Sequence, residues 1–176
     1  RPESVEALGD TAAVKENPRQ SVLTMRFASL GSGSKGNGTL VEWRNTRILV
    51  DCGFSIREAT RRLANLGLGP EQLTAILVTH EHSDHFGGVV PLAHRYGLPV
   101  LMTAGTAQAA GADFSGLTAI VPDLEFALGD LGVTPVAVPH DAREPVQFVF
   151  RSDRHQLGLL TDLGAITPHV VDRYRR

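Results

Sequence analysis

An apolar segment that runs directly into a window rich in histidine and carboxylate limits most strongly what this chain can fold into. Ala75–Val78 has the composition of a buried strand, and Thr79-His80-Glu81-His82-Ser83-Asp84-His85 follows it without a break. Neutral imidazoles and carboxylates are the ligands that zinc and similar divalent metals use in proteins. Two histidines one residue apart on an irregular loop can point their nitrogens at one ion, while Asp84 and His85 face a second ion beside it. The pattern predicts a metal site at the end of a buried strand.

Short strand-like runs alternate with helical patterns along the rest of the chain. We expect strands at Arg26–Leu30, Thr39–Trp43, Thr46–Asp51, Ala75–Val78, Val100–Met102, Leu124–Leu128, Val133–Val138, Val146–Phe150 and Leu157–Thr161. The expected helices are about Ile56–Leu66, Val89–Tyr96, Thr106–Ala110 and a last one that begins at Pro168. Strands with helices between them predict a mixed α/β (α+β) domain whose sheets are covered by helices.

The first 24 residues differ from the rest of the chain. Residues 1–24 are polar and have no clear period, whereas a strand-like pattern begins abruptly at Met25. We expect residues 1–24 to be a poorly ordered leader or extension, with a short helix around Val5–Val14 as the alternative. Residues 25–176 would then form a single domain.

The segment Gly31–Gly38 is rich enough in glycine to predict a tight loop. Its backbone N–H groups could face an anion, and Ser32, Ser34 and Asn37 could add donors. A glycine-rich segment between two strands also serves simply as a turn, so both interpretations stay open.

Composition excludes several classes of protein. The 176 residues carry a net charge of −2, so no global basic field indicates nucleic-acid binding, although one basic face is compatible with that value. A single cysteine, Cys52, excludes an internal disulfide. No run approaches the roughly 20 apolar residues of a membrane span, and no signal peptide is visible. We therefore expect a cytoplasmic protein that does not enter a membrane.

The motif H-x-H-x-D-H at His80–His85 resembles the signature of the metallo-β-lactamase superfamily. Asp51, before Cys52-Gly53, matches the structural aspartate that orients the metal loop in that family. His140 matches the third histidine of the first metal, and Asp162 matches the carboxylate that bridges two metals. The resemblance runs from Met25 to about Gly164. It implies an αββα sandwich of which about the first two-thirds is present.

Within this superfamily the chain is similar to the YycJ (WalJ) branch. The stretches that carry this likeness are Leu30–Asn37, Val50–Gly53, His140–Ala142 and Thr161–Gly164. The resemblance implies a phosphodiesterase or a 5′-to-3′ exonuclease, with nucleic acid, specifically DNA, as its substrate.

The resemblance also implies a mechanism that uses two divalent ions, zinc or manganese, with iron conceivable. The implied metal ligands are His80, His82 and His140 for the first ion and Asp84, His85 and Asp162 for the second. Two such ions lower the pKa of a bridging water, so that hydroxide can attack phosphorus near neutral pH. Asp84 is in addition the catalytic candidate for passing a proton. Glu81 is expected to point away from the metals.

One departure from the family leaves alternatives open. The family pattern continues past the bridging aspartate and ends in another histidine that completes the second metal, whereas this sequence stops at Arg176. We expect a fragment, or a chain that another copy or a complementing chain completes. The same ligand set also suits a glyoxalase II-like thiolester hydrolase. A non-catalytic metal-binding module is the third alternative.

Overall fold

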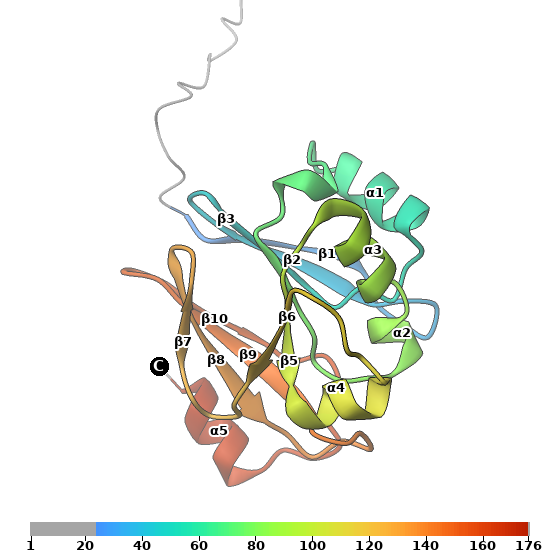
Figure 1. Ribbon diagram of the computed structural model, residues 1–176. Coiled ribbons are helices and arrows are strands. Elements are labelled where there is room, and N and C mark those ends of the chain that lie inside the picture. The colour runs from blue at the N-terminus through green and yellow to red at the C-terminus, as the bar shows by residue number, and fades with distance from the viewer. Residues whose placement is uncertain (1–23, 176) are drawn as a thin grey trace, which may run out of the picture.

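Two β-sheets packed face to face form the centre of the protein, and helices cover their outer faces (Figure 1). This computed structural model describes residues 24–175. The first sheet has the order β1 (Arg26–Gly31), β2 (Gly38–Trp43), β3 (Thr46–Val50), β4 (Ala75–Leu77), β5 (Val100–Thr103) and β6 (Leu117–Ile120). The second has the order β10 (Gln156–Leu159), β9 (Val146–Arg151), β8 (Leu131–Ala137) and β7 (Phe126–Leu128). The helices are α1 (Ile56–Ala64), η1 (Pro70–Gln72), α2 (Ser83–Phe86), α3 (Val89–Tyr96), α4 (Ala104–Ala110) and α5 (Pro168–Tyr174).

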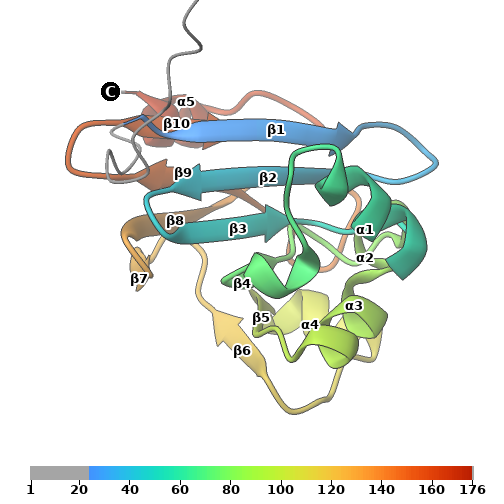
Figure 2. The same cartoon turned by 90° about the horizontal axis from the view of Figure 1, so that it is seen from above.

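The direction of the strands in the first sheet determines where its helices lie. Strands β1, β2 and β3 are antiparallel and need only short turns between them. Strands β3 to β6 are parallel, so each connection must cross the sheet, and these connections contain α1, then α2 and α3, then α4. Figure 2 shows these helices beside the sheet.

Strand β4 is buried on both faces, which explains its unbroken apolar sequence. Ile76 packs in the cluster between the first sheet and the helices, together with Leu63 of α1 and Leu92 of α3. Its neighbour Leu77 points the other way, into the cluster between the two sheets, which also contains Phe148 of β9. Each large apolar side chain that is fully buried contributes about 1.5–3 kcal/mol.

Helix α5 covers the second sheet and completes the αββα order of layers. Its Val170 is buried, and the Tyr174 hydroxyl donates a hydrogen bond to the Leu159 carbonyl of β10 at 2.8 Å. Burial raises the pKa of Tyr174 above its ordinary value. The expected α/β fold with helices outside two sheets is thereby confirmed.

Three local expectations differ from the structure. Strand β6 was not expected, because Leu117–Ile120 is a short edge strand with a single buried residue and therefore has no apolar pattern. The run expected as a strand at Leu124–Leu128 forms β7 only from Phe126, since Asp123 adopts a left-handed φ of 64° that bends the chain before it. The histidine loop, expected to be irregular, contains the helical turn α2.

The expectations for residues 1–24 mostly concern residues outside the described part of the chain. The leader at 1–24 and the alternative helix at Val5–Val14 fall on residues 1–23, which are not described. In residues 24–175, no helix has the length and apolar character needed to cross a membrane.

The turn α2 packs against the segment after β3 so closely that glycine is required there. A Cβ on Gly53 would lie 1.8 Å from the Asp84 carbonyl oxygen. A backbone hydrogen bond holds the two segments together, since Cys52 N–H donates to His85 O at 2.7 Å. A third segment, the loop before β2, adds Asn37, whose N–H donates to Asp84 O at 2.7 Å. Two predicted site residues therefore owe their positions to a backbone contact that only glycine permits.

We expect Gly53→Ala to destabilise the fold more than Gly97→Ala. The first change forces backbone against backbone, with a cost at or above the upper end of the 1–3 kcal/mol that is roughly typical of overpacking. Gly97 ends α3 with a φ of 66° and has open space around it, so alanine there incurs only the left-handed strain of about 1–2 kcal/mol. Chemical denaturation of both variants measures the difference, and equal losses would contradict the close packing.

Candidate metal centre

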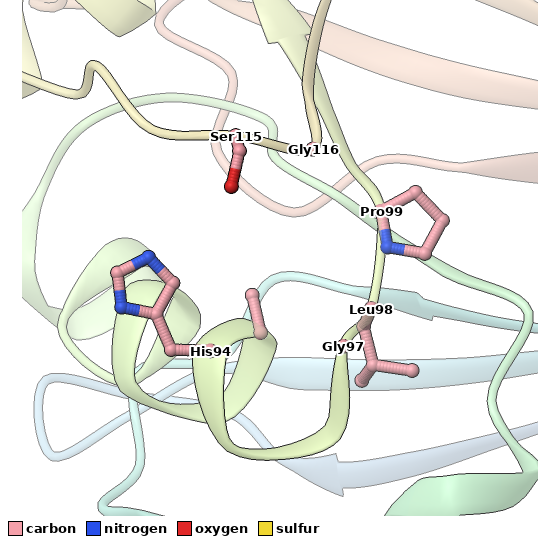
Figure 3. Close-up of a pocket in the computed structure, with 7 residues that line it drawn as sticks. His94, Gly97, Leu98, Pro99, Ser115 and Gly116 are labelled. Atoms are coloured by element: carbon pink, nitrogen blue, oxygen red, sulfur yellow. The ribbon is translucent and has the colours of Figure 1, made fainter.

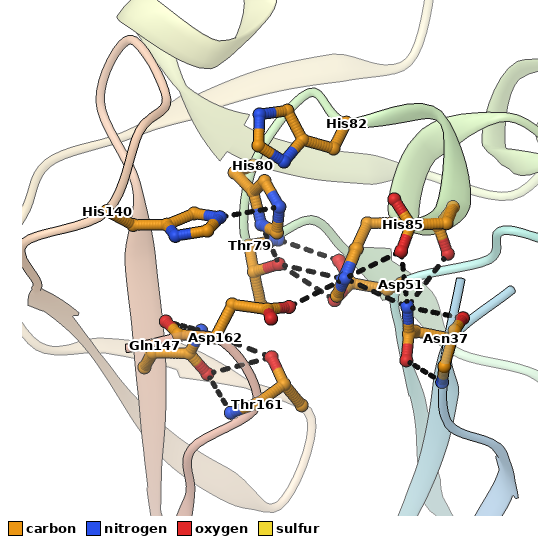
Figure 4. A network of polar contacts seen from close by, with 12 residues as sticks. Asn37, Asp51, Thr79, His80, His82, His85, His140, Gln147, Thr161 and Asp162 are labelled. Atoms are coloured by element: carbon orange, nitrogen blue, oxygen red, sulfur yellow. Dashed lines mark hydrogen bonds and ion pairs between the residues drawn. The ribbon is translucent and has the colours of Figure 1, made fainter. Parts of the chain in front are cut away.

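A buried carboxylate, Asp51, lies directly after β3 at the bottom of the site (Figure 4). Asp51 is 1% exposed, and its Oδ1 accepts the backbone N–H of Thr79 at 2.8 Å. Its Oδ2 accepts the Thr79 hydroxyl at 2.8 Å. Asp51 has a left-handed φ of 60°, which aspartate tolerates better than most residues. The expected contact between Asp51 and the histidine loop is confirmed.

The hydrogen bonds of Thr79 determine which nitrogen of His80 faces the site. Because the Thr79 hydroxyl gives its proton to Asp51, its oxygen accepts a hydrogen bond from His80 Nδ1 at 2.9 Å. The lone pair of His80 Nε2 therefore faces the other histidines. Burial lowers the pKa of His80 to about 4, and the neighbouring His85 acts in the same direction. His80 is thus neutral at pH 7, as a metal ligand must be.

His85 lies between two carboxylates. Its Nδ1 donates to Asp51 Oδ2 at 2.8 Å, and its Nε2 lies 2.7 Å from Asp162 Oδ2. Burial by itself would lower the pKa of His85, but the hydrogen bond to Asp51 and the negative charge of Asp162 outweigh it and raise that pKa. At pH values below this raised pKa, His85 keeps a proton on Nε2. A cation that binds Nε2 must displace that proton.

Three histidines form a first group of potential ligands. His80, His82 and His140 each offer one nitrogen, and these nitrogens all lie within 4.8 Å of one another. The Nε2 atoms of His80 and His140 are 3.3 Å apart. Two nitrogens bound at about 2.0–2.1 Å to one tetrahedral zinc ion would be about 3.3 Å apart, so the spacing fits a shared cation.

A second group, His80, His85 and Asp162, shares its first member with the three histidines. Its ligand atoms also lie within 4.8 Å of one another. Asp84, predicted as a ligand of the second ion, is not part of either group. Its Oδ2 lies 3.7 Å from His85 Nε2 and accepts a hydrogen bond from the Asn37 amide at 3.0 Å. The structure therefore groups five of the six predicted ligands, and Asp84 lies beside them.

Two further residues, Asn37 and Gln147, hold this site in place through contacts that the sequence does not predict. Asn37 was considered only as an anion donor, but its amide nitrogen contacts Asp84 and also lies 2.9 Å from His85 Nε2. Gln147 was not considered at all. Its carbonyl accepts the Thr161 N–H at 2.9 Å and its amide donates to the Asp162 carbonyl at 3.3 Å. A buried glutamine inside the apolar strand β9 was the signal that could have found it.

The bottom of the site is buried, and its rim is partly exposed to solvent. His80 and His85 are almost fully buried, whereas the side chains of Asp84 and Asp162 are 31% and 39% exposed. A separate pocket of about 460 Å³ lies at the end of α3, and His94 and Ser115 face it (Figure 3). None of the predicted site residues lines this pocket. The candidate metal centre therefore meets solvent at Asp84 and Asp162, and also at His82 and His140, which are partly buried.

Comparison with known families agrees with the geometry. The family model described as "Beta-lactamase superfamily domain" matches residues 46–176, which include the histidine loop, His140 and Asp162. The chain belongs to this superfamily. Membership implies divalent metal ions, and the structure has a histidine cluster that could hold them.

Two curated relatives of the chain are named as exodeoxyribonucleases. Exodeoxyribonuclease WalJ of Streptococcus pneumoniae is 35% identical over 158 residues, which are 86% of this chain and 59% of that protein. Exodeoxyribonuclease YycJ of Bacillus anthracis is 34% identical, over 83% of this chain and 57% of that protein. The chain therefore spans less than two thirds of the length of these relatives.

The structural neighbours have the same fold at lower sequence identity. The metallo-β-lactamase fold protein YhfI of Bacillus subtilis aligns with a TM-score of 0.62 and 21% identity, over 76% of this chain and 60% of that one. The Rm3 metallo-β-lactamase aligns with a TM-score of 0.63 and 19% identity, over 82% of this chain and 65% of that one. These likenesses establish the metallo-β-lactamase fold.

We expect the affinity of this superfamily member for divalent metal to rise with pH. His80 is already neutral above about pH 4, whereas the raised pKa of His85 means that metal competes with a proton at Nε2. As pH rises through the pKa of His85 the competition ends and affinity increases. Competition titration with a chelating dye at pH 6, 7 and 8 measures the trend, and a flat profile would contradict it.

Asp51→Asn should weaken metal binding by about 10–100-fold, the usual effect of losing a carboxylate that orients a metal-binding histidine. Asparagine cannot accept all the hydrogen bonds that Asp51 receives, so His80 and His85 lose their fixed orientation. The matched control is Asp141→Asn, because Asp141 also contacts a histidine, at 3.2 Å from His140 Nδ1, but its side chain is 86% exposed. The control should change affinity by less than about threefold, since exposed ion pairs contribute little.

Proposed function

We propose that the protein is a metal-dependent hydrolase that cleaves phosphodiester bonds in DNA, as an exonuclease. The proposal rests on two adjacent groups of potential ligands that have His80 in common. One group consists of His80, His82 and His140, and the other consists of His80, His85 and Asp162. Adjacent two-metal sites of this kind are used in nucleases and phosphatases. The likeness to relatives named as exodeoxyribonucleases supports DNA as the substrate.

The proposed ligands divide between two ions. His80, His82 and His140 would hold the first ion, and Asp84, His85 and Asp162 would hold or bridge the second. Imidazole and carboxylate donors accept zinc, manganese and iron, and we propose zinc or manganese. When bound, such ions supply Lewis-acid polarisation of the phosphate and lower the pKa of a water molecule.

The residues of the chain itself orient these ligands and receive protons. Asp51 and Thr79 hold His80 with its Nε2 toward the site, so no reorganisation is needed when a ligand arrives. Asp84 is partly exposed and is held by the Asn37 amide at 3.0 Å. We propose Asp84 as the group that accepts a proton from water and passes it on, because it combines a fixed position with access from the rim.

Substrate would approach the rim rather than a closed pocket. The carboxylates of the site are partly exposed, and the glycine-rich loop between β1 and β2 lies nearby, since its Gly33 N–H donates to Asn37 Oδ1 at 2.9 Å. An open site suits a polymer end better than a small thiolester. The cytoplasmic location and the contribution of another chain or copy stay predictions.

The proposal is tested on the purified chain with metal analysis and a DNA assay. We expect about two ions per chain, and hydrolysis of end-labelled linear DNA that depends on zinc or manganese. Asp162→Ala should lower the metal content clearly and slow hydrolysis by about 100-fold or more, because several kcal/mol of charge stabilisation depend on the metals.

Asp153→Ala serves as the control, since Asp153 pairs with Arg44 at the surface and should leave both readouts unchanged. Two bound ions with thiolester hydrolysis and no DNA hydrolysis would overturn the proposal in favour of the glyoxalase II-like alternative. Two bound ions with no hydrolysis of either substrate would indicate a metal-binding module.

A further inference from the structure

Glu81 lies between two proposed ligands, yet its side chain turns toward a different segment. Its Oε1 accepts the backbone N–H of Arg143 at 2.7 Å. Its Oε2 is buried and has no hydrogen-bond partner among the described residues. Glu81 belongs to neither of the two ligand groups. The carboxylate is therefore committed to the segment that contains Arg143 rather than to the candidate metal centre.

Arg143 lies three residues after His140, in the loop that connects β8 to β9 of the second sheet. His80 and His82 belong instead to the first sheet, since they follow β4. The hydrogen bond from Arg143 to Glu81 thus joins the two loops whose histidines must meet. It connects the loop after β4 to the loop after β8. In sequence, Glu81 is next to His80 and His82, and Arg143 is three residues from His140.

The other end of the His140 loop is also attached to the first sheet. The Glu144 carboxylate accepts the Gly105 N–H at the start of α4 at 2.6 Å. The Glu144 carbonyl accepts the Thr103 hydroxyl at 2.8 Å, and the Val146 N–H donates to the Thr79 carbonyl at 3.0 Å. Between these anchors and His140, two side chains of the histidine loop contact the His140 loop: Glu81 accepts the Arg143 N–H, and His82 Nε2 lies 3.2 Å from the Asp141 carbonyl. Glu81 is the one of the two that belongs to neither ligand group.

We propose that Glu81 is a positioning residue that sets the distance between His140 and the histidines of the first sheet. By holding the Arg143 N–H, it keeps His140 Nε2 at 3.3 Å from His80 Nε2, the spacing that fits one cation. It acts as a hydrogen-bond acceptor, not as a metal ligand or a carrier of charge. This inference rests on the proposed metal-dependent function, because it assigns Glu81 a task in building that centre.

The test compares two substitutions of the same residue. Glu81→Gln keeps an oxygen that can accept the Arg143 N–H, whereas Glu81→Ala removes the acceptor. We expect Glu81→Ala to lower the affinity of the three-histidine group for cobalt(II) or zinc by about 10–100-fold, and Glu81→Gln to stay within about threefold of wild type. Arg143→Ala is the matched control, because it removes the side chain but leaves the N–H that Glu81 binds.

Each outcome decides the question. Equal losses of metal affinity in Glu81→Ala and Glu81→Gln would mean that the negative charge matters. Affinities equal to wild type in both variants would mean that Glu81 has no role in the centre. Either result overturns the proposal. Thermal unfolding without added metal identifies a variant that fails through loss of fold. Rescue by glutamine then separates positioning from a general structural effect.

A second measurement separates this inference from the proposed function. Hydrogen exchange of the segment that contains Arg143, without added metal, should be faster in Glu81→Ala than in wild type and unchanged in Glu81→Gln. If this pattern and the affinity pattern both hold while DNA is not hydrolysed, the proposed function fails and the role of Glu81 stands. If exchange is the same in all variants, the role of Glu81 is overturned whatever the activity.

Discussion

The buried carboxylate of Asp51 is the group on which the rest of the site depends. It receives hydrogen bonds from the Thr79 backbone, from the Thr79 hydroxyl and from His85 Nδ1, each at 2.8 Å. A buried charge is tolerated only when it is paired and hydrogen-bonded, and here the partners are also the residues that orient the two buried histidines. The same contacts that stabilise Asp51 therefore determine which imidazole nitrogens face the site.

The second sheet contributes the side of the site that faces Asp51 and the histidine loop, namely His140 and Asp162. His140 follows β8 and Asp162 follows β10, so both come from strands that are far from the histidine loop in sequence. The apolar cluster between the sheets holds the two halves in register, and Gln147 fixes the backbone of Asp162. The proposed role of Glu81 belongs to the same problem, because ligands on two layers must meet within a few tenths of an ångström to share an ion.

The architecture was predictable where a pattern of residues has a single physical meaning. Strand β4 is apolar throughout because both of its faces are buried, and α3 ends at Gly97, which takes the left-handed conformation that such an end requires. Strand β6 was not predictable, since it lies at an edge and buries a single residue. The start of β7 depends on the bend at Asp123, which the neighbouring sequence does not indicate.

The sequence by itself determined the chemistry of the site: histidines and carboxylates in one short window, with Asp51, His140 and Asp162 recognisable through a family resemblance. Tertiary structure alone decided how these groups meet. Asn37, Gln147 and Glu81 act through contacts with residues distant in the chain, and a single sequence does not show which partners they meet, although a glutamine inside the apolar run of β9 marks Gln147 as unusual. The protonation of His80 and His85 was likewise set by folding, because burial and neighbouring charges, rather than residue type, move their pKa values in opposite directions.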